Sequence, residues 1–317
     1  MNTSDPVGGS ATSLTMPEPL RPGDRVVVLA PAGPVPRDRL DRGLAWLRAS
    51  GFDVVEAAAL RGRSGHGLPF LAGDDDRRRH DLVTALRDPD VRAVVAARGG
   101  DGTPRLLDAM PWDELAAAPP TIVAGLSDLT CLHQALARRL GWATLWSPMP
   151  GTAVLGGTAP DEWSRAGLLA ALTGRGDPLV LAGQTLVDGP AVTAPLVGGT
   201  LALLSAMVGT PGHQRADGAI AVLEDVGERP YRIERFLTHL LRAGFFDGCR
   251  GIAVGDLVDC EPADQTMAVV ADFARRVALP VVVGLSFGHG PRQASLWLGR
   301  PATLDPATAT LSQAPRP

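Results

Sequence analysis

Short apolar runs alternate with amphipathic helical patterns through the first half of the chain. Strands are predicted over residues 25–30, 51–55, 91–97, 121–124 and near 142–146, and helices over 37–50, from Asp74 and after Ser127. This alternation is typical of a parallel α/β sheet, because each parallel strand needs a crossover connection before the next strand can begin. Ligands of such sheets bind at the carboxyl ends of the strands.

Beyond about residue 176 the pattern changes to short β-prone runs separated by glycine, aspartate and proline. Strands are predicted over 178–181, 184–187, 191–194, 218–223, 252–254 and 280–284, and helices over 201–208, 231–243 and 263–277. The sequence therefore predicts the α/β class, with an N-terminal parallel α/β sheet domain over 20–165, a linker over 166–180 and a β-rich α+β C-terminal domain over 181–310. Residues 1–19, rich in small residues and proline, are predicted to be a disordered tail and not a signal peptide.

All thirty basic residues of the chain are arginines, so lysine chemistry is excluded. The chain can form no Schiff base through lysine, carry no biotin and supply no lysine to a phosphate-binding loop. A net charge of −4 without a basic stripe argues against a nucleic-acid partner, and no apolar run is long enough to cross a membrane. Cys131, Cys249 and Cys260 fit neither a disulfide framework nor a zinc site, which favours a reducing cytoplasm.

Ser127 follows the predicted strand 121–124 and precedes a helical pattern with leucines on one face. A serine at such a turn has the amide N–H groups of the new helix beside it, where they can stabilise an oxyanion. The motif therefore suggests a nucleophile, although serine and aspartate are also common helix N-caps. The run Gly125–Leu129 does not have the GxSxG pattern of ordinary α/β-hydrolases.

A glycine-rich turn, Arg98-Gly99-Gly100-Asp101-Gly102, follows another predicted strand. Consecutive glycines allow backbone N–H groups to converge on an anion, which suits either a phosphate site or half of an oxyanion hole. The turn is not GxGxxG, so dinucleotide binding has weak support. The arginines beside His80 are predicted to lie on a solvated helix face, and no histidine has metal-ligand spacing.

Glu224 and His289 are candidates for acid–base chemistry. Glu224 is predicted to end an apolar strand, where a carboxylate is costly unless it is paired or used. Asp225 and Glu228 compete for that role, and a salt bridge of Glu224 or Glu228 with a nearby arginine is the plainer interpretation. His289 stands between two glycines that leave its ring open, although it can also be an ordinary loop histidine.

The ordered set of these motifs resembles the LD-carboxypeptidase family of serine peptidases, family S66, which includes muramoyltetrapeptide carboxypeptidases and microcin-immunity hydrolases. The matching stretches are Arg21–Asp24, Ala30–Ala32, Arg98–Gly102, Gly125–Thr130, Gly198–Leu201, Leu223–Glu228, Pro230–Arg235 and Gly288-His289. They cover about residues 20–300. The sequence departs from the usual family pattern at Asp101, Leu126, Thr200 and Trp146-Ser147-Pro148.

The resemblance implies a Ser-His-Glu triad in a cleft between the two domains, with no metal or cofactor. Ser127 would be the nucleophile, His289 the general base and Glu224 the acid that orients it, while the N–H groups of Gly100 and Asp128 would form the oxyanion hole. It also implies a homodimer.

Substrate contacts are expected from Gly99, Asp101, Thr200 and Arg232. A carboxypeptidase must hold a free carboxylate, and in a chain without lysine the natural cation is an arginine, of which Arg232 is the first choice. The alternative for Arg232 is a salt bridge with Glu228 or Glu234. The expected substrate is a murein tetrapeptide; the alternatives are a peptide or aminoacyl-conjugate antibiotic, or a noncatalytic ligand-binding role.

Overall fold

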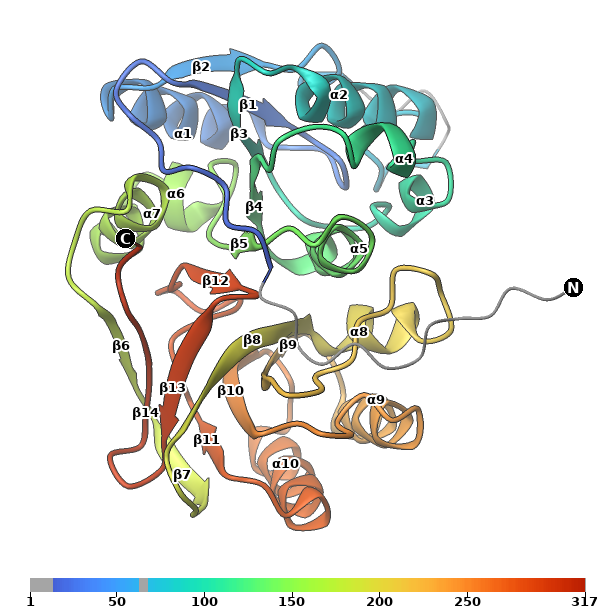
Figure 1. The fold of residues 1–317 in the computed structure, drawn as a ribbon, viewed down its shortest axis with the longest axis vertical. Coiled ribbons are helices and arrows are strands. Elements are labelled where there is room, and N and C mark those ends of the chain that lie inside the picture. Colours follow the sequence, from blue (N-terminus) through green and yellow to red (C-terminus); the bar gives the residue numbers. More distant parts are fainter. Residues whose placement is uncertain (1–13, 63–67, 317) are drawn as a thin grey trace, which may run out of the picture.

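The computed structural model describes residues 14–62 and 68–316, which form two sheets with their covering helices (Figure 1). The first sheet is rich in parallel strands and comes mainly from the N-terminal half of the chain, and the second comes from the C-terminal half and nearly closes into a barrel. The predicted fold class is therefore confirmed.

The first sheet has the strand order β12-β5-β4-β3-β1-β2. Its strands are β1 Arg25–Leu29, β2 Asp53–Glu56, β3 Val91–Ala96, β4 Ile122–Gly125, β5 Thr144–Trp146 and β12 Leu296–Leu298. All neighbours pair in parallel except β12, which adds to β5 in the antiparallel direction. The carboxyl ends of β1, β3 and β4 therefore lie at one edge of the sheet.

Helices cover both faces of this sheet, and β1 shows how the sequence separates them. Val26 and Val28 pack with α1 (Arg37–Ala49), α6 (Ala153–Gly156) and α7 (Glu162–Thr173), whereas Val27 and Leu29 pack in the cluster of the other face. That second face carries α2 Asp75–Arg87, α3 Pro104–Leu107, α4 Trp112–Leu115 and α5 Thr130–Leu140. Successive residues of a strand point to opposite faces, so a continuous apolar run fills both layers.

The second sheet has the order β6-β14-β13-β8-β9-β10-β11-β7. Its strands are β6 Leu179–Ala182, β7 Gln184–Val187, β8 Val192–Thr200, β9 Ile220–Val226, β10 Gly251–Val258, β11 Val281–Val283, β13 Pro301–Asp305 and β14 Thr310–Gln313. Strands β8 to β11 pair in parallel. The two edge strands, β6 and β7, are separated in sequence by Gly183 alone, which brings the sheet close to closure.

Three helices cover the parallel part of the second sheet: α8 Leu201–Met207, α9 Pro230–Arg242 and α10 Ala263–Val277. Ile233 and Leu237 of α9 and Phe273 of α10 pack in one buried cluster with residues of β9 and β10. Helix α10 has the predicted bounds, and the charged side of α9 is left to solvent.

The chain does not divide at the predicted linker as simply as its composition suggests. Residues 166–180 contain the second half of α7, whose Leu168 and Leu172 are fully buried, and the start of β6. Strand β12, within the predicted C-terminal domain, belongs to the first sheet because its residues pair with the exposed edge of β5. The predicted tail lies outside the described residues up to residue 13, but Thr15 pairs with Trp142 and is therefore held in place.

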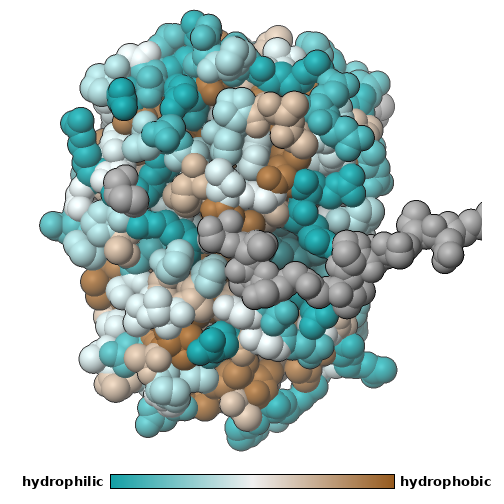
Figure 2. All heavy atoms as spheres, in the orientation of Figure 1, coloured by the Kyte–Doolittle hydropathy of each residue, from teal (hydrophilic) through white to brown (hydrophobic). Residues whose placement is uncertain are grey.

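Hydrophilic side chains cover most of the face drawn in Figure 2, and hydrophobic ones form smaller groups between them. Exposed large hydrophobic residues of the described chain include Phe70, Val180 and Tyr231. Among residues 14–62 and 68–316, no helix has both the length and the apolar character that crossing a bilayer requires.

Candidate active site

Ser127 begins a short 3₁₀ turn, η1 (Ser127–Leu129), between β4 and α5, which confirms the predicted order of strand, turn and helix. Its backbone φ is +68°, a left-handed conformation that a non-glycine residue seldom adopts. The side chain is partly exposed. Such backbone strain often marks a functional site, because it holds a side chain in a direction that an ordinary turn would not give.

The glycine-rich turn after β3 packs directly against Ser127. A Cβ atom on Gly99 would lie 2.7 Å from the Ser127 Cβ and 3.0 Å from its Oγ, so only a bare backbone fits there. Gly100 is exposed and has a φ of +125°, which favours glycine, and Asp101 is exposed beside it. The structure therefore brings Gly99 to the serine and places Gly100 and Asp101 on the open side of the turn.

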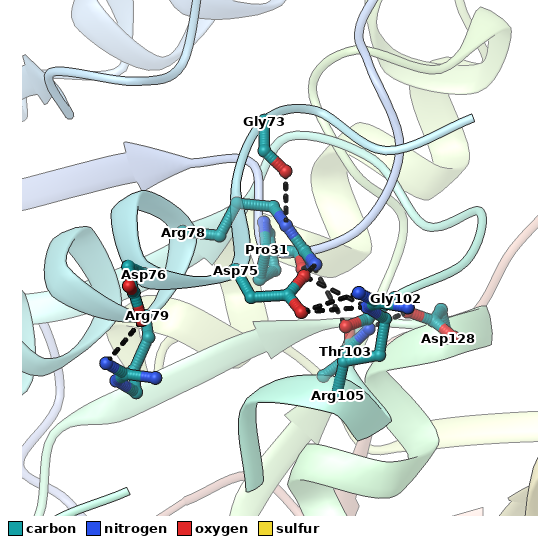
Figure 3. A network of polar contacts seen from close by, with 10 residues as sticks. All are labelled: Pro31, Gly73, Asp75, Asp76, Arg78, Arg79, Gly102, Thr103, Arg105 and Asp128. Atoms are coloured by element: carbon teal, nitrogen blue, oxygen red, sulfur yellow. Dashed lines mark hydrogen bonds and ion pairs between the residues drawn. The ribbon is translucent and has the colours of Figure 1, made fainter. Parts of the chain in front are cut away.

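Asp128 joins this turn to the serine turn through its side chain. Its Oδ2 accepts the backbone N–H of Thr103 at 2.7 Å, and the carboxyl is almost wholly buried (Figure 3). Burial raises the pKa of Asp128 to about 6, while the hydrogen bond from the Thr103 N–H acts in the opposite direction. The sequence pointed to the backbone N–H of Asp128 as a functional group. It did not predict that the carboxyl of Asp128 binds the Thr103 N–H.

Glu224 and His289 are hydrogen-bonded to each other, although 65 residues separate them in the sequence. His289 Nδ1 lies 2.6 Å from Glu224 Oε2, and the two side chains are 19% and 0% exposed. Gly288 makes this approach possible, because a Cβ there would lie 2.7 Å from Glu224 Oε2. With Nδ1 turned toward the carboxylate, Nε2 is the ring nitrogen available to other groups.

The pKa of His289 reflects two opposing effects. Burial lowers it, but the hydrogen bond and the negative charge of Glu224 raise it, with smaller contributions from Asp225 and Asp256. The raising effects prevail, so that the pKa lies above its ordinary value. A carboxylate paired in this way both fixes the ring and stabilises its protonated form.

Glu224 does not end its strand as predicted. Strand β9 continues to Val226, because Asp225 and Val226 still pair with β10. Adjacent strand residues point to opposite sides, so Asp225 points away from Glu224 and accepts the N–H of Ala202, at the start of α8, at 2.9 Å. Burial raises the pKa of Asp225 to about 7. The alternation of the strand thus decides which of the two carboxylates meets His289.

Thr200 connects the two halves of the site. Its hydroxyl donates to Glu224 Oε1 at 2.5 Å, and its backbone N–H donates to Thr130 Oγ1 at 3.1 Å. The Thr130 hydroxyl in turn donates to the carbonyl of Ser127 at 2.6 Å. A hydrogen-bonded path therefore runs from the serine turn of one domain to the Glu224–His289 pair of the other. Thr200 is 3% exposed, and its contact with a substrate stays a prediction.

Asp256 is a part of the candidate site that no sequence motif predicted. It lies inside β10, where its Oδ2 accepts the N–H of Gly290 at 3.2 Å and its own N–H donates to the carbonyl of Phe287 at 2.8 Å. Both contacts flank His289 and hold its loop. Burial raises the pKa of Asp256 to about 6. An acidic residue within the apolar run 251–258 was the available signal.

Arg232, at the start of α9, is engaged with Glu228. Its guanidinium forms an ion pair with Glu228 Oε2 and donates to Glu228 Oε1 at 3.3 Å, and it lies over the Phe236 ring. The side chain is 47% exposed. The salt bridge considered as the alternative for Arg232 is therefore present. In the described part of the chain, no cluster of three or more His, Cys, Asp or Glu residues could hold a metal ion.

A two-domain α/β protein with a serine on a strained turn, and with a buried glutamate paired to a partly exposed histidine on the adjoining domain, has the design of a serine-type hydrolase. Family models described as the LD-carboxypeptidase N-terminal and C-terminal domains match residues 26–147 and 193–304. The chain belongs to the LD-carboxypeptidase family, peptidase family S66, and is a serine-type carboxypeptidase-like hydrolase.

Curated relatives match over nearly the whole chain. A carboxypeptidase-named protein of Streptomyces coelicolor is 43% identical over 302 residues, which are 94% of this chain and 96% of the relative. The murein tetrapeptide carboxypeptidase of Pseudomonas aeruginosa is 32% identical, over 89% of this chain and 93% of the relative.

Among solved structures, the microcin C7 self-immunity protein MccF in complex with aspartyl sulfamoyl adenosine has the same fold. Its TM-score is 0.83 at 20% identity, over 95% of this chain and 99% of that chain. An active-site mutant of MccF, in which a serine, an asparagine and a lysine are replaced by alanine, gives the same TM-score at the same identity and coverage.

Proposed function

We propose that this protein hydrolyses a peptide bond through Ser127, His289 and Glu224, as an LD-carboxypeptidase that releases the C-terminal D-amino acid of a murein tetrapeptide. The observation that carries the proposal is the 2.6 Å contact between His289 and Glu224. Hydrogen bonds through Thr200 and Thr130 connect this pair to the serine turn. The name of the Pseudomonas aeruginosa relative supports the choice of substrate.

In the proposed reaction, Nε2 of neutral His289 takes the proton from the Ser127 hydroxyl as its oxygen attacks the scissile carbonyl. Glu224 stabilises the imidazolium, which then gives its proton to the leaving amine. Water then hydrolyses the acyl-enzyme: His289 takes a proton from the attacking water and returns it to the Ser127 oxygen as that oxygen leaves. The raised pKa of His289 suits a group that must carry a proton for part of the cycle.

The oxyanion hole is assigned to the backbone N–H groups of Gly100 and Asp128. Gly99 packs on Ser127, Gly100 follows it directly, and the Thr103–Asp128 hydrogen bond fixes the two turns to each other. Two donors held by such contacts need no reorganisation when charge develops on the carbonyl oxygen. Gly99 and Asp101 are assigned to the substrate side of this turn, and Thr200 to the same site, next to Glu224.

The alternative substrate is an aminoacyl conjugate of the kind found in the MccF complex. One observation favours the tetrapeptide: the active-site mutant of MccF replaces a lysine, and this chain contains none. Any carboxylate of the substrate would meet arginine here. Arg232 stays our candidate, and a substrate would have to compete with Glu228 for it.

The test is mass-spectrometric analysis of purified protein with a murein tetrapeptide and with aspartyl sulfamoyl adenosine, and with Ser127→Ala protein as control. We expect loss of the terminal residue from the tetrapeptide only. Cleavage of the conjugate alone would establish the alternative activity. Failure with both substrates, together with no labelling by a serine-directed phosphonate, would indicate a noncatalytic ligand-binding protein.

The proposed function also carries an expected cellular location and an expected oligomeric state. Recycling of murein peptides would place the protein in the cytoplasm, where the buried free thiols of Cys131, Cys249 and Cys260 would stay reduced. A homodimer is proposed from the family resemblance, and light scattering of the purified protein would measure it.

A further inference from the structure

Arg78 lies in α2, outside every role assigned so far, and its side chain is 0% exposed. The sequence predicts a solvated helix face for it, because it stands among Arg77, Arg79 and His80. A guanidinium is costly to bury unless its donors are satisfied. Its neighbour Arg79 behaves as predicted, since it is partly exposed and pairs with Asp76 at 2.7 Å.

The Arg78 guanidinium binds three separate loops at the carboxyl edge of the first sheet (Figure 3). Nε donates to the carbonyl of Gly73, before α2, at 3.2 Å. Nη1 donates to the carbonyl of Pro31, after β1, and to that of Gly102, after β3, the latter at 2.9 Å. Nη2 donates to Asp75 Oδ1 at 2.5 Å, and Arg105 binds the same carboxylate. One fork-shaped cation thus joins segments that are distant in sequence.

The contact with Gly102 leads directly to the serine. Gly102 has a φ of +115°, and a Cβ there would lie 2.9 Å and 3.1 Å from the two terminal nitrogens of Arg78. The next residue, Thr103, donates its N–H to Asp128, which follows Ser127. The path Arg78–Gly102–Thr103–Asp128 therefore links the two turns that carry Gly100 and Asp128.

We propose that Arg78 is a positioning residue for the oxyanion hole. It fixes the turn 98–102 against the Ser127 turn and so keeps the backbone donors of the two turns in place. This inference rests on the proposed function, because it takes Gly100 and Asp128 as the oxyanion donors. Only arginine suits the place: lysine has a single nitrogen and cannot meet carbonyls on several sides with fixed geometry. A shift of about 1 Å in such donors can cost roughly 100-fold in rate.

The test compares Arg78→Lys and Arg78→Ala with Arg79→Ala, the matched control on the same helix. Active sites are titrated with a serine-directed phosphonate, and kcat and KM are measured on the tetrapeptide per titrated site. We expect kcat to fall roughly 10- to 100-fold in both Arg78 variants, with KM changed less than about 3-fold, because the donors act on the transition state. Millimolar guanidinium should restore part of the kcat of Arg78→Ala, and Arg79→Ala should behave as wild type.

Unchanged kcat per titrated site would overturn the inference, even if the yield of folded protein fell, since Arg78 would then be only structural. If Arg78→Ala does not fold, Arg78→Lys alone decides between these results. A wild type that neither reacts with the phosphonate nor cleaves the tetrapeptide would instead contradict the proposed function. If the wild type reacts with the phosphonate and cleaves the tetrapeptide, and both Arg78 variants keep the wild-type kcat per titrated site, this inference alone is contradicted.

Discussion

The serine side and the histidine side of the candidate site are held by different kinds of contact. On the serine side, Ser127 is fixed by strained backbone and by the bare backbone of Gly99, with buried Arg78 and Asp128 binding carbonyl and N–H groups around it. On the histidine side, the side chains of His289 and Glu224 form a hydrogen bond, and the Thr200 hydroxyl donates to the second carboxylate oxygen of Glu224.

The difference teaches where each side tolerates substitution. Backbone contacts depend on the absence of a Cβ and on loop geometry, so conservative changes of nearby side chains should matter little on the serine side unless they touch Arg78 or Asp128. Side-chain contacts depend on single atoms, so on the histidine side a change of one oxygen to nitrogen should be felt at once.

Ser127→Ala should have the largest effect. If Ser127 is the nucleophile, kcat should fall by about 100,000-fold or more while the fold persists, because alanine keeps the turn and removes only the attacking oxygen. Steady-state turnover and circular dichroism measure the two parts of this prediction. Activity close to wild type in a folded variant would remove the serine side from the mechanism.

Glu224→Gln should rank second, with a loss of about 1,000- to 10,000-fold in kcat, because glutamine neither stabilises the imidazolium nor fixes the correct tautomer. Glu228→Gln is the matched control, since Glu228 pairs with Arg232 and not with His289. Comparison of kcat for the two variants is the measurement. A larger loss in Glu228→Gln would mean that the wrong carboxylate has been assigned to the histidine.

Local patterns predicted the serine side well where neighbours in sequence decide the structure. The strand, turn and helix around Ser127 follow from one apolar run and one leucine stripe. Arg78 could not be predicted in the same way, because the carbonyls that justify its burial come from Pro31 and Gly102, which only the fold brings to it. A run of three arginines otherwise indicates a solvated face.

On the histidine side, local patterns made Glu224 and His289 candidates for acid–base chemistry, but only the family resemblance predicted that they act as a pair. His289 and Glu224 are in contact, but the strand continues past Glu224 because pairing with β10 continues there. Asp256 was missed because its partner, the Gly290 N–H, lies in a loop that nothing local connects to β10. The substrate contact of Thr200 stays a prediction, and the hydrogen bond from its hydroxyl to Glu224 was not predicted, because only the fold brings these two residues together.

Thr200→Val should separate the two sides further. Valine keeps the shape of threonine but leaves Glu224 Oε1 without its buried donor, a loss of about 1.5–3 kcal/mol for a hydrogen bond to a charged group. We expect kcat to fall roughly 10-fold or more and to recover in Thr200→Ser, which keeps the hydroxyl. Equal kcat in Thr200→Val and wild type would show that Glu224 needs no second oxygen contact.

The pH profile gives a smaller effect with a defined sign. The general base must be neutral, so kcat/KM should fall as the pH drops through the raised pKa of His289. Asp256→Asn removes a negative charge that raises this pKa, while its amide oxygen can still accept the Gly290 N–H. The acid limb of the profile should therefore move to lower pH. An unchanged limb, with exposed Asp272→Asn as the control, would contradict this account of His289.

The smallest effect is expected from Arg232→Ala. Arg232 is half-exposed and already paired with Glu228, so a terminal carboxylate would gain only a partly screened partner. If Arg232 binds that carboxylate, KM should rise by about 3- to 10-fold for the free-acid tetrapeptide, because one charged hydrogen bond is lost, and should change little for the C-terminal amide.

Arg235→Ala is the matched control on α9, since Arg235 lies over the Tyr231 ring. Equal changes with both substrates would leave Arg232 as a surface partner of Glu228. Rapid cleavage of the amide by the wild type would favour conjugate hydrolysis, which needs no terminal carboxylate.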